Sequence, residues 1–148
     1  MSQRGLKAPL TLVLLAGAGC VHTKSTIPFH EEELRSPYYA LMYVYREEST
    51  IDADVSWGVW LDENSVGRLR QGAYLTFHVP PGTHTVSVGG NASRSIHLYS
   101  AVRLISRMEI KAKGGETYYL RCKGHERRLL TRDQAIGSLR TMKYDQGD

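Results

Sequence analysis

The eight residues YALMYVYR, at positions 39–46, decide the fold class of this chain. Aromatic and branched side chains dominate the segment, and such side chains favour β-strands. Because alternate residues of a strand point to opposite sides of a sheet, large side chains fall on both faces here. The segment therefore predicts a strand that is covered on both sides.

Period-two alternation continues through further short segments towards the C-terminus. In residues 55–61, Trp57, Val59 and Leu61 share one face, and DENS at 62–65 indicates a turn. The other expected strands cover residues 66–69, 73–79, 83–88, 96–110 and 116–122. About seven short strands with regular turn signals predict a mainly β fold, an antiparallel β-sandwich, with a barrel as the alternative.

One α-helix is expected to close the chain, over residues 131–143. Thr131 to Gln134 (TRDQ) has the pattern of a capping box, in which the two end residues bond each other's backbone amides. Apolar residues then recur at helical spacing, at Ala135, Ile136, Leu139 and Met142. We expect this stripe to pack on the sandwich; docking of a partner protein is the alternative.

A hairpin is expected across PPG at 80–82, because the strands on either side then match their apolar faces. In this pairing Phe77 lies opposite Val86. His78 and His84 then point to opposite faces, since a one-residue slip would turn a whole apolar set outwards. The remaining histidines lack HxH and HExxH spacing. We therefore expect no metal site.

The N-terminal residues have the three parts of a secretory signal. A basic start (Arg4, Lys7) is followed by the apolar residues 8–16 (APLTLVLLA) and by small residues before Cys20. The apolar run is well short of the ~20 residues that span a bilayer. We therefore expect residues 1–19 to be removed as a signal peptide.

LLAGAGC at 14–20 resembles the lipobox of bacterial lipoproteins, whose cysteine becomes the lipidated first residue of the mature chain. The resemblance implies that acyl chains on Cys20 anchor the protein, since burial is worth about 0.8 kcal/mol per CH₂. Val21 in place of Asp implies the outer membrane, with the domain facing the periplasm. These signals usually carry Leu where this chain has Gly17, and cleavage by the ordinary signal peptidase is the alternative.

Removal of the expected signal peptide changes both the length and the net charge of the chain. The full chain has 148 residues, of which 19 are basic and 15 acidic; removing residues 1–19 takes two basic residues and no acid, so the net charge falls from +4 to +2. So small an excess argues against nucleic-acid binding. Residues 20–37 are polar, with EEE at 31–33, and are expected to form a flexible tether. Residues 38–148 then form one domain, the β-sandwich with its C-terminal helix.

Catalytic signatures are missing from the sequence. It contains neither a G-x-S-x-G elbow nor a Walker A loop. Cys122 alternates with Tyr118 and Leu120 on one strand face and is expected to be a small buried hydrophobe. Asp62 and Glu63 are expected to be turn residues. We therefore expect no cofactor and no enzymatic activity, with a cryptic hydrolase as the remaining catalytic alternative.

Four aromatic residues are candidates for a ligand or partner face, namely Trp60, Tyr43, Tyr45 and Tyr74. Trp60 alternates away from Trp57, and the three tyrosines are candidates for the same aromatic face. Aromatic rings offer rigid, amphipathic contact area to sugars or peptides. The alternative is that this face is covered by the C-terminal helix or by a partner sheet.

Several motifs follow one another in the order typical of one group of proteins. They are YVYR at 43–46, VWLD at 59–62, VGRL at 66–69, GAY at 72–74, VPPGTHTV at 79–86 and GETYY at 115–119. In this order they resemble small Gram-negative lipoproteins of uncharacterised function, whose domain is similar to PEGA-type surface β-sandwiches. The resemblance spans residues 40–122 and implies a β-sandwich at the cell envelope, with no catalytic residues.

The sequence as a whole predicts a lipid-anchored envelope protein that binds or scaffolds an unknown envelope partner without catalysis. Its membrane contact is expected through lipidated Cys20, and nucleic acid is not an expected partner. The main alternative is a lipoprotein that binds a glycan or a peptidoglycan fragment through the aromatic face.

Overall fold

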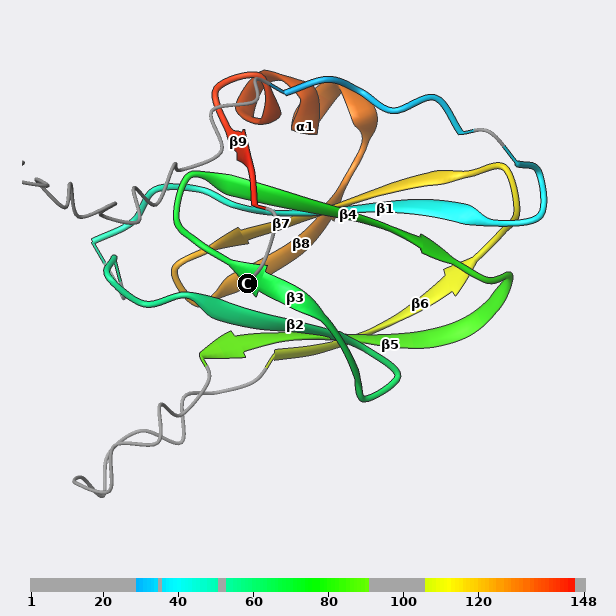
Figure 1. Ribbon diagram of the computed structural model, residues 1–148, viewed down its shortest axis with the longest axis horizontal. Coiled ribbons are helices and arrows are strands. Elements are labelled where there is room, and N and C mark those ends of the chain that lie inside the picture. The colour runs from blue at the N-terminus through cyan, green and yellow to red at the C-terminus, as the bar shows by residue number, and fades with distance from the viewer. Residues whose placement is uncertain (1–28, 35, 51–52, 91–105, 146–148) are drawn as a thin grey trace, which may run out of the picture.

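Two β-sheets stack face to face in the computed structural model, which describes residues 29–34, 36–50, 53–90 and 106–145 (Figure 1). The first sheet has the strand order β8-β7-β1-β4-β9, and the second sheet has the order β3-β2-β5-β6. The strands of the first sheet are β1 (Ala40–Arg46), β4 (Ala73–Val79), β7 (Thr117–Lys123), β8 (Glu126–Leu130) and β9 (Lys143–Tyr144). Those of the second are β2 (Trp57–Leu61), β3 (Asn64–Leu69), β5 (Gly82–Gly90) and β6 (Ser106–Ala112). One helix, α1 (Arg132–Leu139), lies on the outer face of the first sheet.

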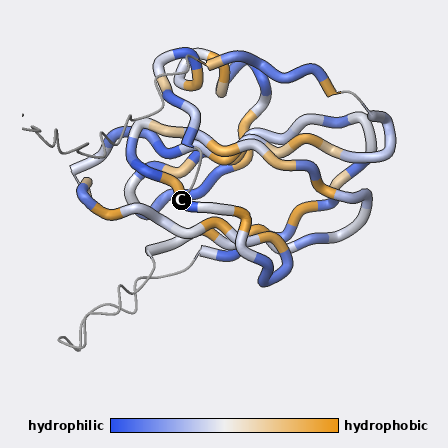
Figure 2. The backbone as a smooth tube through the Cα atoms, viewed as in Figure 1, coloured by the Kyte–Doolittle hydropathy of each residue, from blue (hydrophilic) through white to orange (hydrophobic). Residues whose placement is uncertain are grey.

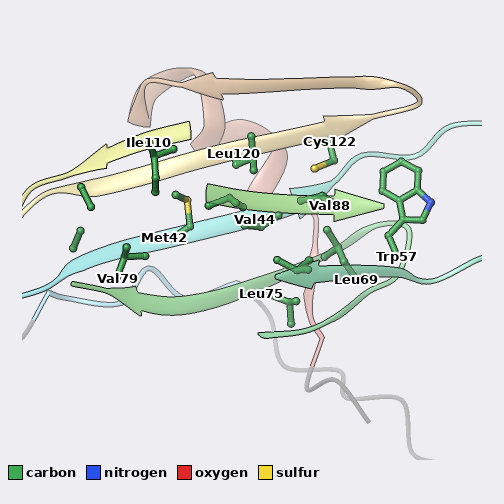
Figure 3. Packing of buried hydrophobic residues seen from close by; sticks show 14 of the residues in the cluster. Met42, Val44, Trp57, Leu69, Leu75, Val79, Val88, Ile110, Leu120 and Cys122 are labelled. Atoms are coloured by element: carbon green, nitrogen blue, oxygen red, sulfur yellow. The ribbon is translucent and has the colours of Figure 1, made fainter. Parts of the chain in front are cut away.

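Strand β1 is buried along its whole length, since none of its seven residues is more than 1% exposed. Met42 and Val44 face the space between the sheets, where they join the inner core (Figure 3). Leu41, Tyr43 and Tyr45 point the other way, into a second cluster under α1. The expectation of a strand covered on both faces is confirmed.

Alternation also places the other core residues. Trp57 and Val59 are buried in the inner core with Leu61 packed against it, and Leu120 and Cys122 share that core. Figure 2 shows hydrophobic residues recurring along the strands of both sheets and hydrophilic residues in the turns between them. The mainly β class and the buried cysteine are therefore confirmed.

The pairing of the strands differs from the sequence expectation in two ways. Strands β1 and β7 run parallel, as do β4 and β9, while the other pairs are antiparallel. The described residues also hold nine strands, against the seven or so that were expected: β8 and β9 were not predicted from the pattern. Residues 96–105 of the long strand expected over 96–110 lie outside the described residues; β6 begins at Ser106, with Ile110 buried as expected.

The hairpin expected across residues 80–82 is wrong. Phe77 pairs with Met42 of β1, and Val86 pairs with Leu61 of β2, so the two strands belong to different sheets. Two consecutive prolines have no N–H to offer to a ladder, and the chain crosses between the sheets at this point. The apolar faces alone do not distinguish two strands that pair in one sheet from two strands that stack in opposite sheets. In both arrangements the apolar side chains point into the core.

Helix α1 follows the expected capping box. The Thr131 backbone amide donates to Gln134 Oε1 at 3.2 Å. Ala135 and Leu139 are fully buried against the first sheet, as the apolar stripe predicts. The helix ends at Leu139, before the expected residue 143, because the chain turns back to form β9 beside β4.

An ion pair holds the chain after β9. Asp145 is 3% exposed, and its carboxylate accepts the Arg70 backbone amide (2.8 Å) and the Arg70 guanidinium (Nη2 to Oδ1, 2.9 Å). The Asp145 amide in turn donates to the Tyr74 carbonyl at 2.8 Å. These bonds fix the chain that leaves α1 to the first sheet.

Replacing Leu139 with Ala tests whether α1 is an integral part of the core. We expect Leu139→Ala to lower the free energy of unfolding by about 2–5 kcal/mol, because it opens a cavity at a fully buried position. Urea unfolding at neutral pH measures the change. Gly137→Ala is the matched control on the same helix: a Cβ there meets nothing within 4 Å, so stability should rise by up to about 1 kcal/mol. A Leu139→Ala loss below that range would mean that the helix packs only weakly.

Candidate functional site

The outer face of the first sheet carries a cluster of buried tyrosines. The rings of Tyr43 and Tyr119 stack at 5.2 Å between centroids, and Tyr74 lies 6.2 Å from Tyr43. None of the three is more than 4% exposed, and burial raises the pKa of Tyr43 to about 12. This tyrosine cluster is therefore closed to ligands in the folded chain.

Part of the cover comes from the N-terminal segment, residues 29–34, which runs beside α1 (Figure 1). The Phe29 ring meets Tyr74 edge-on at 5.3 Å between centroids. The Glu32 amide donates to the Tyr43 hydroxyl at 2.7 Å, and the Glu32 carboxylate accepts the Thr76 hydroxyl at 3.1 Å. The flexible tether expected over residues 20–37 is thus wrong for this segment, because its apolar and backbone groups complete the tyrosine cluster.

Glu31 ties the N-terminal segment to the helix. Its carboxylate receives two bonds from the Arg132 guanidinium, at 2.8 and 2.5 Å, and one from the Tyr119 hydroxyl, at 2.9 Å. The bonds from Arg132 chiefly lower the pKa of Glu31, with a smaller contribution from Tyr119. An acidic residue of the expected tether therefore supplies the ion pair that closes this face.

The four aromatic candidates do not share one face. Tyr43, Tyr45 and Tyr74 lie under the cover on the first sheet, and Trp60 lies on the second sheet, on the opposite side of the sandwich. On the first sheet, the C-terminal helix covers the tyrosines, as the alternative stated above predicts. Trp60, which is partly exposed, remains as the aromatic residue of an open face.

The Trp60 ring lies on the backbone of its own strand. A Cβ built on Gly58 would stand 2.2, 2.5 and 2.8 Å from three consecutive atoms of the six-membered ring, Cη2, Cζ2 and Cζ3. A point in the ring plane beyond the edge would be much closer to the middle atom than to its neighbours, so these near-equal distances place the face of the ring over Gly58. The absence of a side chain at residue 58 therefore lets the indole lie against the sheet.

A shallow hollow of about 580 Å³ opens beside the indole. It is lined by Trp60, Asp62, Glu63, Thr85, Ser87 and Arg107, and we call it the Trp60 hollow. The register places Trp60, Ser87 and Arg107 in one row across β2, β5 and β6. The small hydroxyl residues of β5 leave the space between the indole and the guanidinium.

The turn between β2 and β3 forms one wall of the hollow. Asp62 and Glu63 have φ values of 47° and 69°, the left-handed conformation that two-residue hairpin turns require. The Asp62 carboxylate accepts the Thr85 amide at 2.8 Å and lies 2.5 Å from His84 Nδ1. These bonds, with that from His84 the larger, lower the pKa of Asp62. Asp62 thus positions the turn, which presents the Glu63 side chain to the hollow.

The lining residues beyond Trp60 were not expected from the sequence as a site. Gly58 stands two residues before Trp60 on the same strand face, and Thr85 and Ser87 are small residues at alternate positions of the next strand. This pattern, a lone tryptophan above small residues, could have indicated a platform. Arg107 could not have been placed, because its position depends on the pairing of β5 with β6.

A second aromatic feature lies at one end of the inner core. The Trp57 ring has the Arg46 guanidinium 3.7 Å and the Arg127 guanidinium 4.1 Å from its centroid. Arg46 also donates to the Val55 carbonyl. Cys122 is buried nearby, and burial raises the pKa of its thiol to about 12. These contacts hold β1, β2 and β8 together and leave no open space for a ligand at the thiol.

The described ranges contain no group of three or more His, Cys, Asp or Glu side chains that could hold a metal ion. The described helix is too short and too polar to cross a bilayer.

The fold and the hollow describe a small β-sandwich domain with one open outer face. Residues 38–132 match the model of the family described as "Protein of unknown function (DUF2846)", and the chain belongs to this family. No curated protein matches the chain. The N-terminal segment and nearly all of α1, which cover the tyrosine cluster, lie outside the matched range.

Acid should weaken the N-terminal cover. A carboxyl group whose pKa is lowered on folding stabilises the fold above its ordinary value of 4.5, and this contribution is lost as the pH falls through the lowered value. We therefore expect Glu31→Gln to lower the urea midpoint at pH 7, with the difference from wild type shrinking below pH 4.5. Glu33→Gln, at an exposed position of the same run, is the control. A difference that stays constant between pH 7 and pH 3 would contradict the ion pair.

Cys122 should be chemically inert in the folded chain. In a Cys20→Ala variant it is the single thiol, and a buried thiol with a raised pKa forms little reactive thiolate. We expect no reaction with Ellman's reagent at pH 8 until urea unfolds the protein, and then release of one equivalent of thionitrobenzoate. Stoichiometric reaction of the folded protein would show that the core opens at this end.

Proposed function

We propose that this chain is a lipid-anchored, non-catalytic binding module of the bacterial cell envelope. Acyl chains on Cys20 hold it to the outer membrane, and the domain faces the periplasm. One observation carries the proposal: among the described residues, the helix and the N-terminal segment cover one outer face of the sandwich, and none covers the other face around Trp60, where the hollow opens. That open face is the surface offered to a partner.

The docked N-terminal segment shortens the link between anchor and domain. Residues 21–28 separate Cys20 from Phe29, and eight residues reach at most about 30 Å when fully extended. The domain is therefore held close to the membrane surface. The N-terminal segment lies on the first sheet, so the open face of the second sheet is on the opposite side of the sandwich from that segment (Figure 1). This placement supports a role in presenting the Trp60 hollow.

The titratable groups support a binding role over a catalytic one. The pKa values of Glu31 and Asp62 are lowered by their ion pairs, which makes them poor general acids near neutral pH. Burial raises the pKa of Cys122 and of Tyr43, which makes them poor nucleophiles and bases. Each of these groups also bonds or packs within the fold. The hydrolase alternative would need two converging carboxylates, and in the hollow Asp62 is already committed to Thr85 and His84.

The signal-like N-terminus and the similarity to PEGA-type surface sandwiches support the envelope location. Both are features of the sequence, and the β-sandwich is the fold that the similarity implies. A glycan or peptidoglycan fragment is the second candidate ligand class, and the composition of the Trp60 hollow favours it over a protein partner.

Lipidation is tested by Cys20→Ala expressed with its full N-terminus in a Gram-negative host. We expect the wild-type protein to sediment with membranes until detergent is added, and Cys20→Ala to appear in the soluble periplasmic fraction. The mass of the mature wild-type chain should exceed that of the polypeptide by its acyl groups.

Cys122→Ala is the matched control and should stay with the membranes, because that residue is buried in the core. Two results would contradict the anchor. One is membrane association of Cys20→Ala; the other is a soluble, unacylated wild-type chain cut by the ordinary signal peptidase.

A further inference from the structure

We infer that the Trp60 hollow is a saccharide-binding site for a neutral, β-linked hexopyranose chain. The inference rests on the proposed function, which makes the second sheet the ligand face, and names the class of ligand. Three observations support the inference: the orientation of the Trp60 ring, the polar groups around the ring, and the position of Trp60 in the sheet.

The indole provides a flat platform. One face of its six-membered ring is pressed against Gly58, so the opposite face is directed away from the sheet. An aromatic face is electron-rich and attracts positively polarised C–H groups. Hexopyranoses with equatorial substituents present just such a face of axial C–H bonds, and β-linkage keeps successive rings extended. The platform therefore fits a flat sugar ring.

The rim of the hollow offers both donors and acceptors. The hydroxyl groups of Thr85 and Ser87 do both, the Arg107 guanidinium donates, and the Glu63 carboxylate accepts. No hydrogen bond or ion pair with another described residue engages the Glu63 carboxylate or the Arg107 guanidinium. Sugar hydroxyls also donate and accept around the whole ring. A few placed polar groups beside an aromatic wall are the usual lining of a ligand site, and about 580 Å³ is within the range of such sites.

Charge excludes a strongly anionic ligand. Two carboxylates, on Asp62 and Glu63, and one guanidinium, on Arg107, line the hollow. A phosphate site would instead gather several cationic or amide donors around the anion. A neutral polyhydroxylated molecule satisfies this mixture of charges.

The position in the sheet argues against an extended peptide. Peptides that add a strand need the unpaired backbone of an edge strand. Trp60 lies on β2 and Ser87 on β5, and both strands are paired on both sides within the order β3-β2-β5-β6. Of the strand residues that line the hollow, only Arg107 lies on an edge strand, β6. Trp60, Thr85 and Ser87 offer their side chains on the face of the sheet, as a face-on saccharide requires.

Asp62 acts as a positioning residue for the site. Its carboxylate bonds the Thr85 amide, and its own amide donates to the Thr85 carbonyl at 2.9 Å. The hairpin turn is thereby joined to β5, which fixes the distance between Glu63 and the hydroxyl row. The rim is built before any ligand arrives.

The test is fluorescence titration of the full-length, lipidated protein in detergent micelles. Cellotetraose and fully N-acetylated chitotetraose are the neutral, β-linked probes. Maltotetraose is the control, because it has the same glucose units as cellotetraose in α-linkage. We expect saturable changes in emission with at least one β-linked probe, and binding of maltotetraose at least about tenfold weaker. Trp57 is buried between two arginines and supplies a constant background.

Three variants assign the binding to the hollow by isothermal titration calorimetry. We expect Trp60→Ala and Gly58→Ala each to weaken binding by roughly tenfold, the first by removing the platform and the second by pushing the ring off the strand. Arg107→Ala should weaken it several-fold. Gly137→Ala, a glycine on the far side of the sandwich with open space around it, should bind as the wild type does. Should Gly58→Ala fail to fold, the partly exposed Trp60 and the exposed Arg107 still decide the question.

Several outcomes would overturn the inference. They are no binding of either β-linked probe up to about 10 mM, equal binding of maltotetraose, or affinity unchanged in Trp60→Ala. A concentration-dependent dimer that Trp60→Ala dissolves would instead make the hollow a contact between copies. Any of these results leaves the membrane test of Cys20 untouched, so failure of the ligand and failure of the anchor are distinguished.

Discussion

The burial of strand β1 on both faces is the constraint on which the rest of the structure depends. A strand with Met42 and Val44 on one side and Tyr43 and Tyr45 on the other needs two separate covers. The second sheet provides the inner cover. The outer cover also supplies partners to two buried phenolic hydroxyls, which would be costly to leave unpaired: residues 29–34 bond those of Tyr43 and Tyr119. The buried Tyr45 hydroxyl has no hydrogen-bond partner among the described residues. Helix α1 and the N-terminal segment are therefore parts of the core.

This constraint makes the two outer faces of the sandwich unequal. On the first sheet, Glu31 and Arg132 join two segments that are distant in sequence and close the tyrosine cluster. On the second sheet, Gly58 and the small hydroxyl residues Thr85 and Ser87 lie around Trp60, and a hollow opens there on the outer surface. A domain built in this way uses one outer face for its own stability. The covered face is also the one on which the N-terminal segment packs.

The sequence predicted local structure well and pairing poorly, for physical reasons. Period-two alternation located most strands and the buried face of Cys122, and the capping box located the start of α1. Alternation says which side of a strand is apolar but not which strand lies beside it, so the crossing between sheets at residues 80–82 was missed. The candidate site shows the same limit. Trp60 was predicted to face away from Trp57, as it does, but its grouping with Tyr43, Tyr45 and Tyr74 failed, because strands of two different sheets carry them. The packed residues 29–34 could not be predicted, since their charges signal exposure and their partners are distant in sequence.

The unequal faces can be measured directly by hydroxyl-radical footprinting of the folded protein with mass spectrometry. Tyr38 is 76% exposed and serves as the internal reference for an accessible ring. The account predicts rapid oxidation of Tyr38 and Trp60, and strong protection of Tyr43, Tyr74 and Tyr119 beneath the helix and the N-terminal segment. Oxidation of the three buried tyrosines at the rate of Tyr38, in a protein that remains folded, would contradict it.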